Sequence, residues 1–126
     1  MSIRLLHMEQ MSGYLAVRFI GEGVPVEVSQ PFDLIAEYCK RTRNNKILID
    51  TRGGDSNPST LDRFIFGEEL QIYARYGIKV SFCCAPEQVD ARKLMVLVAQ
   101  NRGVNVDRFT DFQAAEEWLL KRPPEA

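Results

Sequence analysis

The sequence predicts one α/β domain with a mostly parallel five-stranded sheet, and three observations lead to this fold class. Short apolar runs typical of strands alternate with longer segments whose apolar residues recur at helical spacing. The 126 residues suit one domain, and no repeat, low-complexity tract or interdomain linker divides them. With 45% apolar and 26% charged residues, the chain can bury a core of ordinary size. The element order β-β-α-β-α-β-α-β-α predicts right-handed crossovers, four helices, and an antiparallel N-terminal strand at one edge.

The N-terminal region predicts a hairpin. Residues 3–8 and 14–20 have the composition of two strands, and Gly13 follows a serine at the turn between them. The segment 24–28 alternates like a strand, but Pro25 restricts it to a sheet edge or a loop.

A helix and a buried strand are expected next. The helix is predicted to begin at Ser29 to Pro31, with serine as the N-cap and proline in the first turn. Asn44 and Asn45 are predicted to end it. Residues 47–49 are uniformly apolar, which is typical of a strand buried on both faces.

A second helix is predicted over residues 60–76. Ser59 can serve as its N-cap, and Gly77 suits the left-handed position that follows a helix. Its buried stripe is predicted from helical spacing to contain Leu61, Ile65, Ile72 and Tyr76.

The last third of the chain predicts strand, helix, strand and helix. Residues 78–82 and 104–109 are the strands, and a helix between them begins at Pro86 and ends before Gly103. A capping box that starts at Thr110 opens the final helix. The apolar residues of the helix after Pro86 are Val89, Leu94, Met95, Leu97 and Val98.

Composition argues against several classes of function. The 16 basic and 17 acidic residues give a net charge of −1, so no electrostatic feature favours nucleic acid, and the basic run at 40–43 suits a helix C-terminus. No apolar run approaches the ~18 to 20 residues that span a bilayer. The N-terminus lacks the long apolar segment of a signal peptide. Three cysteines, without a CxxC pair, and a single histidine favour a reducing cytoplasm and predict no metal site and no cofactor.

The junction after residues 47–49 is the most informative stretch. It lacks the lysine of a phosphate-binding Walker loop, and the GxGxxG dinucleotide pattern is absent. Asp50 stands where phosphorylated receiver domains place their aspartate, but the acidic pair and the late lysine that receivers use are missing. We therefore expect Asp50 to accept loop N–H groups and to stabilise the turn.

Hydroxyl groups at the same junction have two interpretations. Ser56, Ser59 and Thr60 precede a helix, where unpaired N–H groups and the helix dipole favour an added phosphate. Capping by Ser59, which contributes ~1 kcal/mol, is the simpler interpretation. The nearby acids Asp55 and Asp62 favour it, because they would repel a phosphate.

Few residues suit covalent catalysis. His7 is the single histidine, and it lies in an apolar strand, so any Ser-His or Cys-His dyad would have to include it. A reactive thiol at Cys83 or Cys84 would need a cation or a helix N-terminus nearby to lower its pKa. The helix that begins at Pro86 could supply such an N-terminus. We expect a protein that is not an enzyme.

Several segments together resemble the SpoIIAA-like group of STAS domains, the anti-sigma-factor antagonists, and their small STAS/SEC14-like relatives. The resemblance implies one SpoIIAA-like βα superhelix over residues 1–126, acting as a regulatory or interaction module without chemistry of its own. It rests on ILIDTRG (47–53), PSTLDRFIFGEEL (58–70), the strand IKVSFCC, and NRGVNVDRFTDFQAAEEWLL (101–120).

The resemblance also suggests two known modes of action. Antagonists of this group carry a phosphorylated serine in an Asp-Ser-x-Gly motif after the corresponding strand. Here Asp55-Ser56 is followed by Asn57-Pro58, without the glycine. SEC14-type relatives carry lipids, which leaves a small apolar ligand as an alternative.

These observations lead to one functional expectation and two alternatives. We expect a cytoplasmic module that binds a protein partner, with a second copy of the chain as one candidate, through the loop 51–60 and the start of the next helix. The alternatives are a binding protein for a small apolar or anionic ligand, held between helices or at 59–62, and a thiol or carboxylate enzyme. The candidate binding residues are Asp50, Arg52, Asp55, Ser56, Ser59, Thr60 and Arg63.

Overall fold

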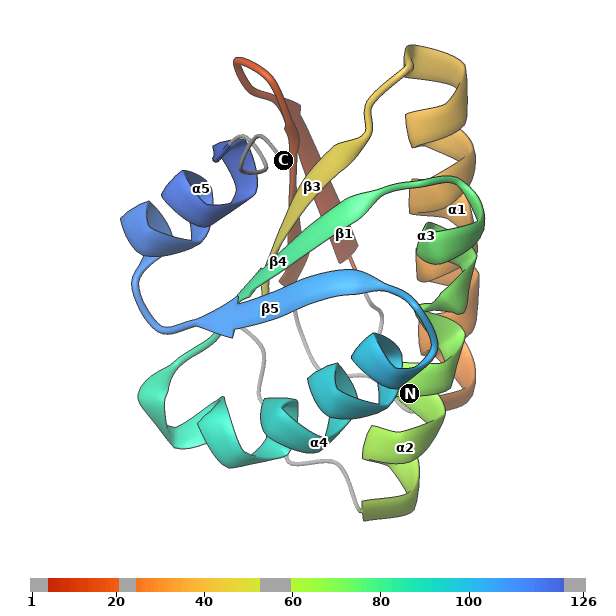
Figure 1. The fold of residues 1–126 in the computed structure, drawn as a ribbon, viewed down its shortest axis with the longest axis vertical. Helices are drawn as coiled ribbons and strands as arrows, with labels where there is room; N and C mark the ends of the chain where they lie inside the picture. Colours follow the sequence, from red (N-terminus) through yellow and green to blue (C-terminus); the bar gives the residue numbers. More distant parts are fainter. Residues whose placement is uncertain (1–4, 21–24, 53–59, 122–126) are drawn as a thin grey trace, which may run out of the picture.

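A five-stranded mixed sheet forms the centre of the computed structural model, which describes residues 5–20, 25–52 and 60–121 (Figure 1). The strands lie side by side in the order of the chain. The first is antiparallel to the second, and all other neighbours are parallel, so the predicted fold class is confirmed. The strands are β1 (Leu5–Gln10), β2 (Leu15–Ile20), β3 (Lys46–Asp50), β4 (Lys79–Cys83) and β5 (Asn105–Phe109).

Helices cover the two faces of this sheet unequally. Four of them lie on one face, where α2 packs against α1 and α4, and α5 alone packs on the other face, against β3, β4 and β5 (Figure 1). The helices are α1 (Pro25–Thr42), α2 (Thr60–Glu69), α3 (Gln71–Arg75), α4 (Val89–Asn101) and α5 (Phe112–Leu120), with a 3-10 turn η1 (Pro86–Gln88) before α4.

Strand alternation divides the apolar residues between two cores. Ile47 and Ile49 belong to the large core beneath α1, α3 and α4, while Leu48 belongs to a small core beneath α5. Beyond the reach of α5, His7 and Arg18 stay exposed on the same face. The sheet is therefore sealed on one face and half open on the other.

The start of α1 differs from the prediction. Ser29 does not cap this helix, because α1 begins at Pro25, and residues 25–28 are helical rather than extended. A proline fits the first turn of a helix, because the N–H groups of that turn have no hydrogen-bond partner within the helix. The helix continues through Pro31, since Phe32, Ile35 and other residues of the next turns are buried in the large core. Their burial outweighs the ~3 kcal/mol that an interior proline costs.

Other local predictions have mixed outcomes. The hairpin turn is confirmed, with Gly13 at φ 90°, and so is the left-handed Gly77, at φ 66°.

The single helix predicted over 60–76 is two helices, since the chain turns at the buried Leu70. The cap of α5 is Asp111 rather than Thr110, because the carboxylate of Asp111 accepts from Ala114 N at 3.0 Å.

The described residues contain neither a membrane-spanning helix nor a metal-binding cluster. None of the helices has both the length and the apolar character needed to cross a membrane. Within the same residues, histidine, cysteine and carboxylate side chains do not gather into a group of three that could hold a metal ion.

Candidate interaction surface

The corner after β3 is built by hydrogen bonds to its neighbour β4. Thr51 is buried, and its backbone N–H donates to the carbonyl of Cys83 at 2.9 Å. This bond extends the parallel pairing of β3 and β4 by one residue beyond Asp50, so the end of β3 stays beside β4.

Asp50 and Arg52 are brought together as partners of one another. The guanidinium donates from Nε to Oδ1 at 3.0 Å and from Nη2 to Oδ2 at 2.9 Å, and the Arg52 backbone N–H also donates to Oδ1 at 3.0 Å. The expectation that Asp50 accepts a loop N–H is thus confirmed. Such a two-pronged contact is among the stronger side-chain hydrogen-bond arrangements.

Electrostatics keep this pair ionised. Burial opposes the charged form of Asp50, but the hydrogen bonds from Arg52, with the charges of Arg52 and Arg18, bring the pKa of Asp50 below its ordinary value. The hydrogen bond to Asp50 raises the pKa of Arg52 in turn. The guanidinium also lies 5.6 Å from the ring centre of Phe112 and so connects the corner to α5. Both residues are occupied by internal contacts.

The other predicted binding residues lie largely outside the described structure. Asp55, Ser56 and Ser59 are not among the described residues. Thr60 opens α2 and Arg63 lies in its first turn, but their side chains are likewise outside the description.

An apolar surface on α2 and α4 was missed by the sequence analysis. Leu61 is 67% exposed, Phe64 is 38% exposed, and Leu97 is 50% exposed. Leu61 was expected in the buried stripe of its helix, and this expectation is wrong; Leu97 was named only as one of the apolar residues of α4. We call Leu61, Phe64, Leu97, Glu68 and Arg102 the α2–α4 surface.

The two helices are in close contact at Gly67. A Cβ on Gly67 would lie 2.6 Å from Cβ of Val98 and 2.7 Å from the carbonyl oxygen of Met95. The helices therefore touch at Gly67, Met95 and Val98, while Leu61, Phe64 and Leu97 are exposed to solvent. The one hint in the sequence was Gly67 itself, a glycine in a helix interior where it costs ~1 kcal/mol and needs a packing reason.

A charged pair borders the apolar side chains. Arg102 Nη2 lies 3.3 Å from Oε2 of Glu68, and the guanidinium carbon lies 5.4 Å from the ring centre of Phe64. The α2–α4 surface thus combines exposed apolar side chains with a partly exposed arginine, a combination that is enriched in protein interfaces.

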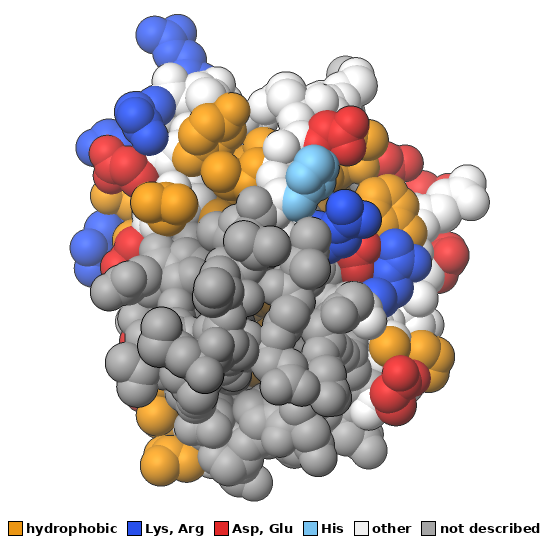
Figure 2. Space-filling model, turned by 180° about the vertical axis from the view of Figure 1, so that it is seen from behind, with side chains coloured by type: hydrophobic (Ala, Val, Ile, Leu, Met, Phe, Trp, Pro, Cys, Tyr) orange, Lys and Arg blue, Asp and Glu red, His pale blue; other side chains and the backbone are white. Residues whose placement is uncertain are grey.

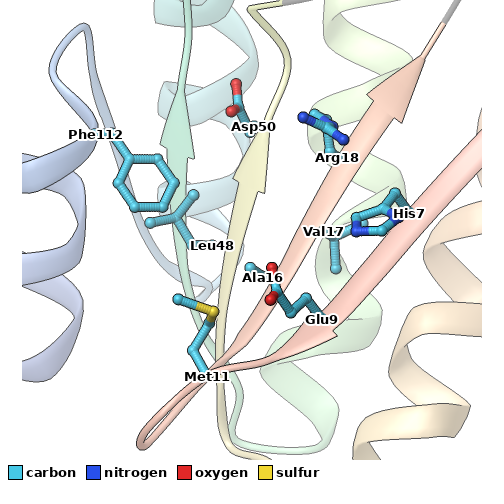
Figure 3. Close-up of a pocket in the computed structure, with 9 residues that line it drawn as sticks. All are labelled: His7, Glu9, Met11, Ala16, Val17, Arg18, Leu48, Asp50 and Phe112. Atoms are coloured by element: carbon cyan, nitrogen blue, oxygen red, sulfur yellow. The ribbon is translucent and has the colours of Figure 1, made fainter.

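The open half of the sheet carries a small hollow with both charged and apolar walls. Its volume is about 130 Å³, and charged side chains of both signs line it together with the single histidine (Figures 2 and 3). The residues that define it are His7, Glu9, Arg18 and Asp50 from the strands, with Phe112 at the start of α5. Met11, Ala16, Val17 and Leu48 complete the lining, so apolar and charged side chains share the walls of the hollow.

Burial affects the thiols of the three cysteines. All three are buried, and none forms a disulfide. Burial raises the pKa of the Cys39 thiol to about 11, and burial likewise raises that of Cys83 to about 11, against a smaller opposing effect of the Arg52 charge. A thiol with such a pKa is almost entirely protonated at neutral pH.

Comparison with known proteins supports the fold. No family model matches this sequence, and no curated protein matches it significantly. Among solved structures, the chain is similar to an uncharacterised protein of the DUF3478 family from Shewanella loihica PV-4, whose structure is described as having a SpoIIAA-like fold. The two are 17% identical, the alignment covers 94% of this chain and 95% of the other, and the TM-score is 0.56. This protein therefore has a SpoIIAA-like fold, as the resemblance in its sequence implies.

Proposed function

We propose that this chain is a cytoplasmic, non-enzymatic STAS-like module that binds a protein partner through the α2–α4 surface and the adjoining loop 51–60. The observation that carries the proposal is the exposure of three large apolar side chains on two packed helices, Leu61, Phe64 and Leu97. Full burial of each such side chain in an interface contributes roughly 1.5–3 kcal/mol, which is the scale of an interface hot spot.

The border of the surface supports a protein partner rather than a membrane or a nucleic acid. Glu68 and Arg102 carry opposite charges and are both partly exposed, so no single sign of charge dominates there. Arginine beside an exposed aromatic ring, as in Arg102 and Phe64, is typical of the anchors of protein interfaces.

The absence of activity is proposed from the state of the reactive groups. Asp50 is occupied by Arg52, and the thiols of Cys39 and Cys83 are buried with raised pKa values. Thiol labelling tests this part. All cysteines of the folded protein should react far more slowly than a free thiol, and labelling of Cys83 at or above the free-thiol rate would contradict the proposal.

Photo-cross-linking in a lysate of the source cells tests the partner. A photoreactive side chain at Leu61 should give a defined adduct of one molecular mass, and the same group at Leu34 should not. Leu34 is a matched control, because it is 58% exposed and lies on α1. A Leu97→Ser change should abolish the adduct at position 61. Equal adducts from positions 61 and 34 would contradict the proposal.

One observation favours binding of a small anion as a second candidate function. A hollow of about 370 Å³ lies where β4 and β5 end, and Cys84, Arg108, Phe109 and Asp111 line it. The Nε atom of Arg108 is buried without a hydrogen-bond partner, and a carboxylate or phosphate could satisfy it. Native mass spectrometry of protein from its own cells should then show a bound small anion that Arg108→Met loses. Wild-type protein at its bare mass would exclude this candidate.

A further inference from the structure

We propose that two copies of this chain associate through antiparallel pairing of their β1 strands, in a register centred on Met8. This inference goes beyond the proposed function, because it names a second interface and a defined partner, a second copy of the chain. It rests on a contrast between the two edges of the sheet and on the charges along β1.

The β5 edge is protected against pairing. The carbonyl of Phe109 accepts from Cys84 N at 2.8 Å, so the odd-numbered residues of β5 direct their backbone groups towards β4. The even-numbered residues then direct theirs outward. The outward carbonyl of Val106 accepts from Nε2 of Gln100 at 2.8 Å, and the outward N–H of Arg108 donates to Asp107 Oδ1 at 2.8 Å. Side chains thus occupy the Val106 carbonyl and the Arg108 N–H, two of the outward backbone groups that another strand would use.

The β1 edge shows no such protection among the described residues. β1 is the outermost strand and pairs with β2 alone. Its six residues, LLHMEQ, include no proline, glycine or lysine, the residues that usually discourage edge pairing. An unprotected edge of this length can accept a further strand.

Symmetry limits the registers in which two β1 strands can pair. A twofold axis perpendicular to the sheet keeps the open face of both copies on the same side, and residues directly opposite must then share a face. The possible registers are therefore centred on a residue, and each places the central residue opposite its own copy.

The charges on the open face select one of these registers. His7 and Glu9 are both exposed and point from β1 to the same side (Figure 3). A register centred on Met8 places His7 of each copy opposite Glu9 of the other copy. Each imidazole N–H can then donate to a carboxylate of the other copy. It also places Met8, which packs against the large core, opposite its own copy. A register centred on His7 or on Glu9 would place like groups opposite each other, which is unfavourable.

The dimer would join the two open half-faces into one. The sheet would continue through both copies, and the hollows lined by His7, Glu9 and Arg18 would lie next to each other. The α2–α4 surface belongs to the other face of the sheet, so both copies of it would remain free. A dimer would bind a repeated or dimeric partner with increased avidity.

Cysteine cross-linking tests the register. Residues directly opposite in an antiparallel pair have Cα atoms about 4.5–5.5 Å apart, which suits a disulfide. The native cysteines are buried and should not interfere. Oxidised Met8→Cys should run as a covalent dimer, whereas His7→Cys and Glu9→Cys should each remain monomeric. A mixture of these last two variants should give a cross-linked heterodimer. Equal dimer yields from all three single variants would overturn the register.

Charge exchange tests the same contacts without covalent chemistry. Glu9→Lys should weaken dimerisation by about tenfold, and His7→Glu combined with Glu9→Lys should restore it. Light scattering on wild-type protein is the decisive measurement, because a monomer at every concentration up to millimolar overturns the proposal. The failure of the dimer leaves the cross-linking test at Leu61 unaffected, so the two proposals can fail separately.

Discussion

The two faces of the sheet are stabilised in different ways. On the face of the large core, buried apolar side chains from β2 to β5 meet α1, α3 and α4. The hydroxyl of Tyr73 joins α3 to α1 by donating to the carbonyl of Phe32, and Gln100 joins α4 to β5 by donating to the carbonyl of Val106. On the other face, α5 covers a small core of five buried residues, and polar contacts attach it to the sheet.

These polar contacts join residues that are distant in the chain. Tyr14 donates to Oε2 of Glu116 at 2.5 Å. The ammonium group of Lys79 donates to the carbonyl of Trp118 at 2.7 Å and lies 4.4 Å from the ring centre of that residue. The comparison indicates that one face depends on apolar packing, while the other depends on a few specific hydrogen bonds around a helix of nine residues.

The largest effect is expected where the large core loses volume. Phe82→Ala should lower the free energy of unfolding by about 3–5 kcal/mol, because Phe82 is fully buried in a central strand and the cavity cannot collapse. Denaturant unfolding would measure it. Leu34→Ala, at an exposed position of α1, is the control and should change stability by less than about 0.5 kcal/mol. A loss of stability no larger than that from removing one contact of α5 would contradict the contrast between the two faces of the sheet.

The next effect tests how closely the helices of the sealed face pack. Gly67→Val should destabilise the protein by about 1–3 kcal/mol, because the added carbon atoms would meet Cβ of Val98 and the Met95 backbone. Gly77→Ala provides a contrast. Its Cβ meets nothing within 4 Å, and its cost arises only from the positive φ. Equal stability of Gly67→Val and wild type would show that α2 and α4 can separate.

On the α5 face, the contact between Tyr14 and Glu116 should contribute about 1–2 kcal/mol, because it joins a buried hydroxyl to a carboxylate. A double-mutant cycle with Tyr14→Phe and Glu116→Gln measures the coupling between them. Burial and the neighbouring carboxylate raise the pKa of Tyr14, so the hydroxyl keeps its proton throughout the neutral range. If the effects of the two changes on the free energy of unfolding were additive, Tyr14 and Glu116 would not stabilise the fold through their contact.

The smallest effect concerns acid stability at the corner beside α5. The pKa of Asp50 is lower in the folded protein than its ordinary value, so its ionised form stabilises the fold above that ordinary value. This stabilisation is lost as the pH falls through the lowered pKa. Because Arg52 is partly exposed, the contribution should be at most about 1 kcal/mol.

The pH dependence of Asp50→Asn measures this contribution. The stability difference between wild type and Asp50→Asn should be present at neutral pH and should disappear in strong acid, where both side chains are neutral. A difference that stays constant with pH would show that the geometry of the turn, rather than the ion pair, stabilises the corner.

Local patterns predicted a large part of this structure. The run 47–49 indicated a strand covered on both faces, and glycine at positions 13 and 77 indicated left-handed turns. The interpretation of Asp50 as an acceptor for loop N–H groups was also correct, because an aspartate two residues before an N–H forms this bond within the turn itself.

The errors lie where contacts between helices decide the outcome. Helical spacing places Leu61 and Leu97 among apolar residues, but spacing does not say which side of a helix will meet a neighbour. Gly67 allows α2 and α4 to touch at Met95 and Val98, and both leucines are exposed to solvent. The start of α1 at Pro25 has a similar origin, since packing of its later turns overrides the cap predicted at Ser29.

By itself, the sequence determined the order of strands and helices, the mostly parallel sheet and the corner at Asp50, because these depend on residues that are neighbours in the chain. The tertiary structure alone decided that α5 covers only part of its face, that none of the described side chains protects the β1 edge, and that apolar side chains of α2 and α4 face solvent. These features arise from pairs such as Tyr14 and Glu116, or Gly67 and Val98, which only folding brings together.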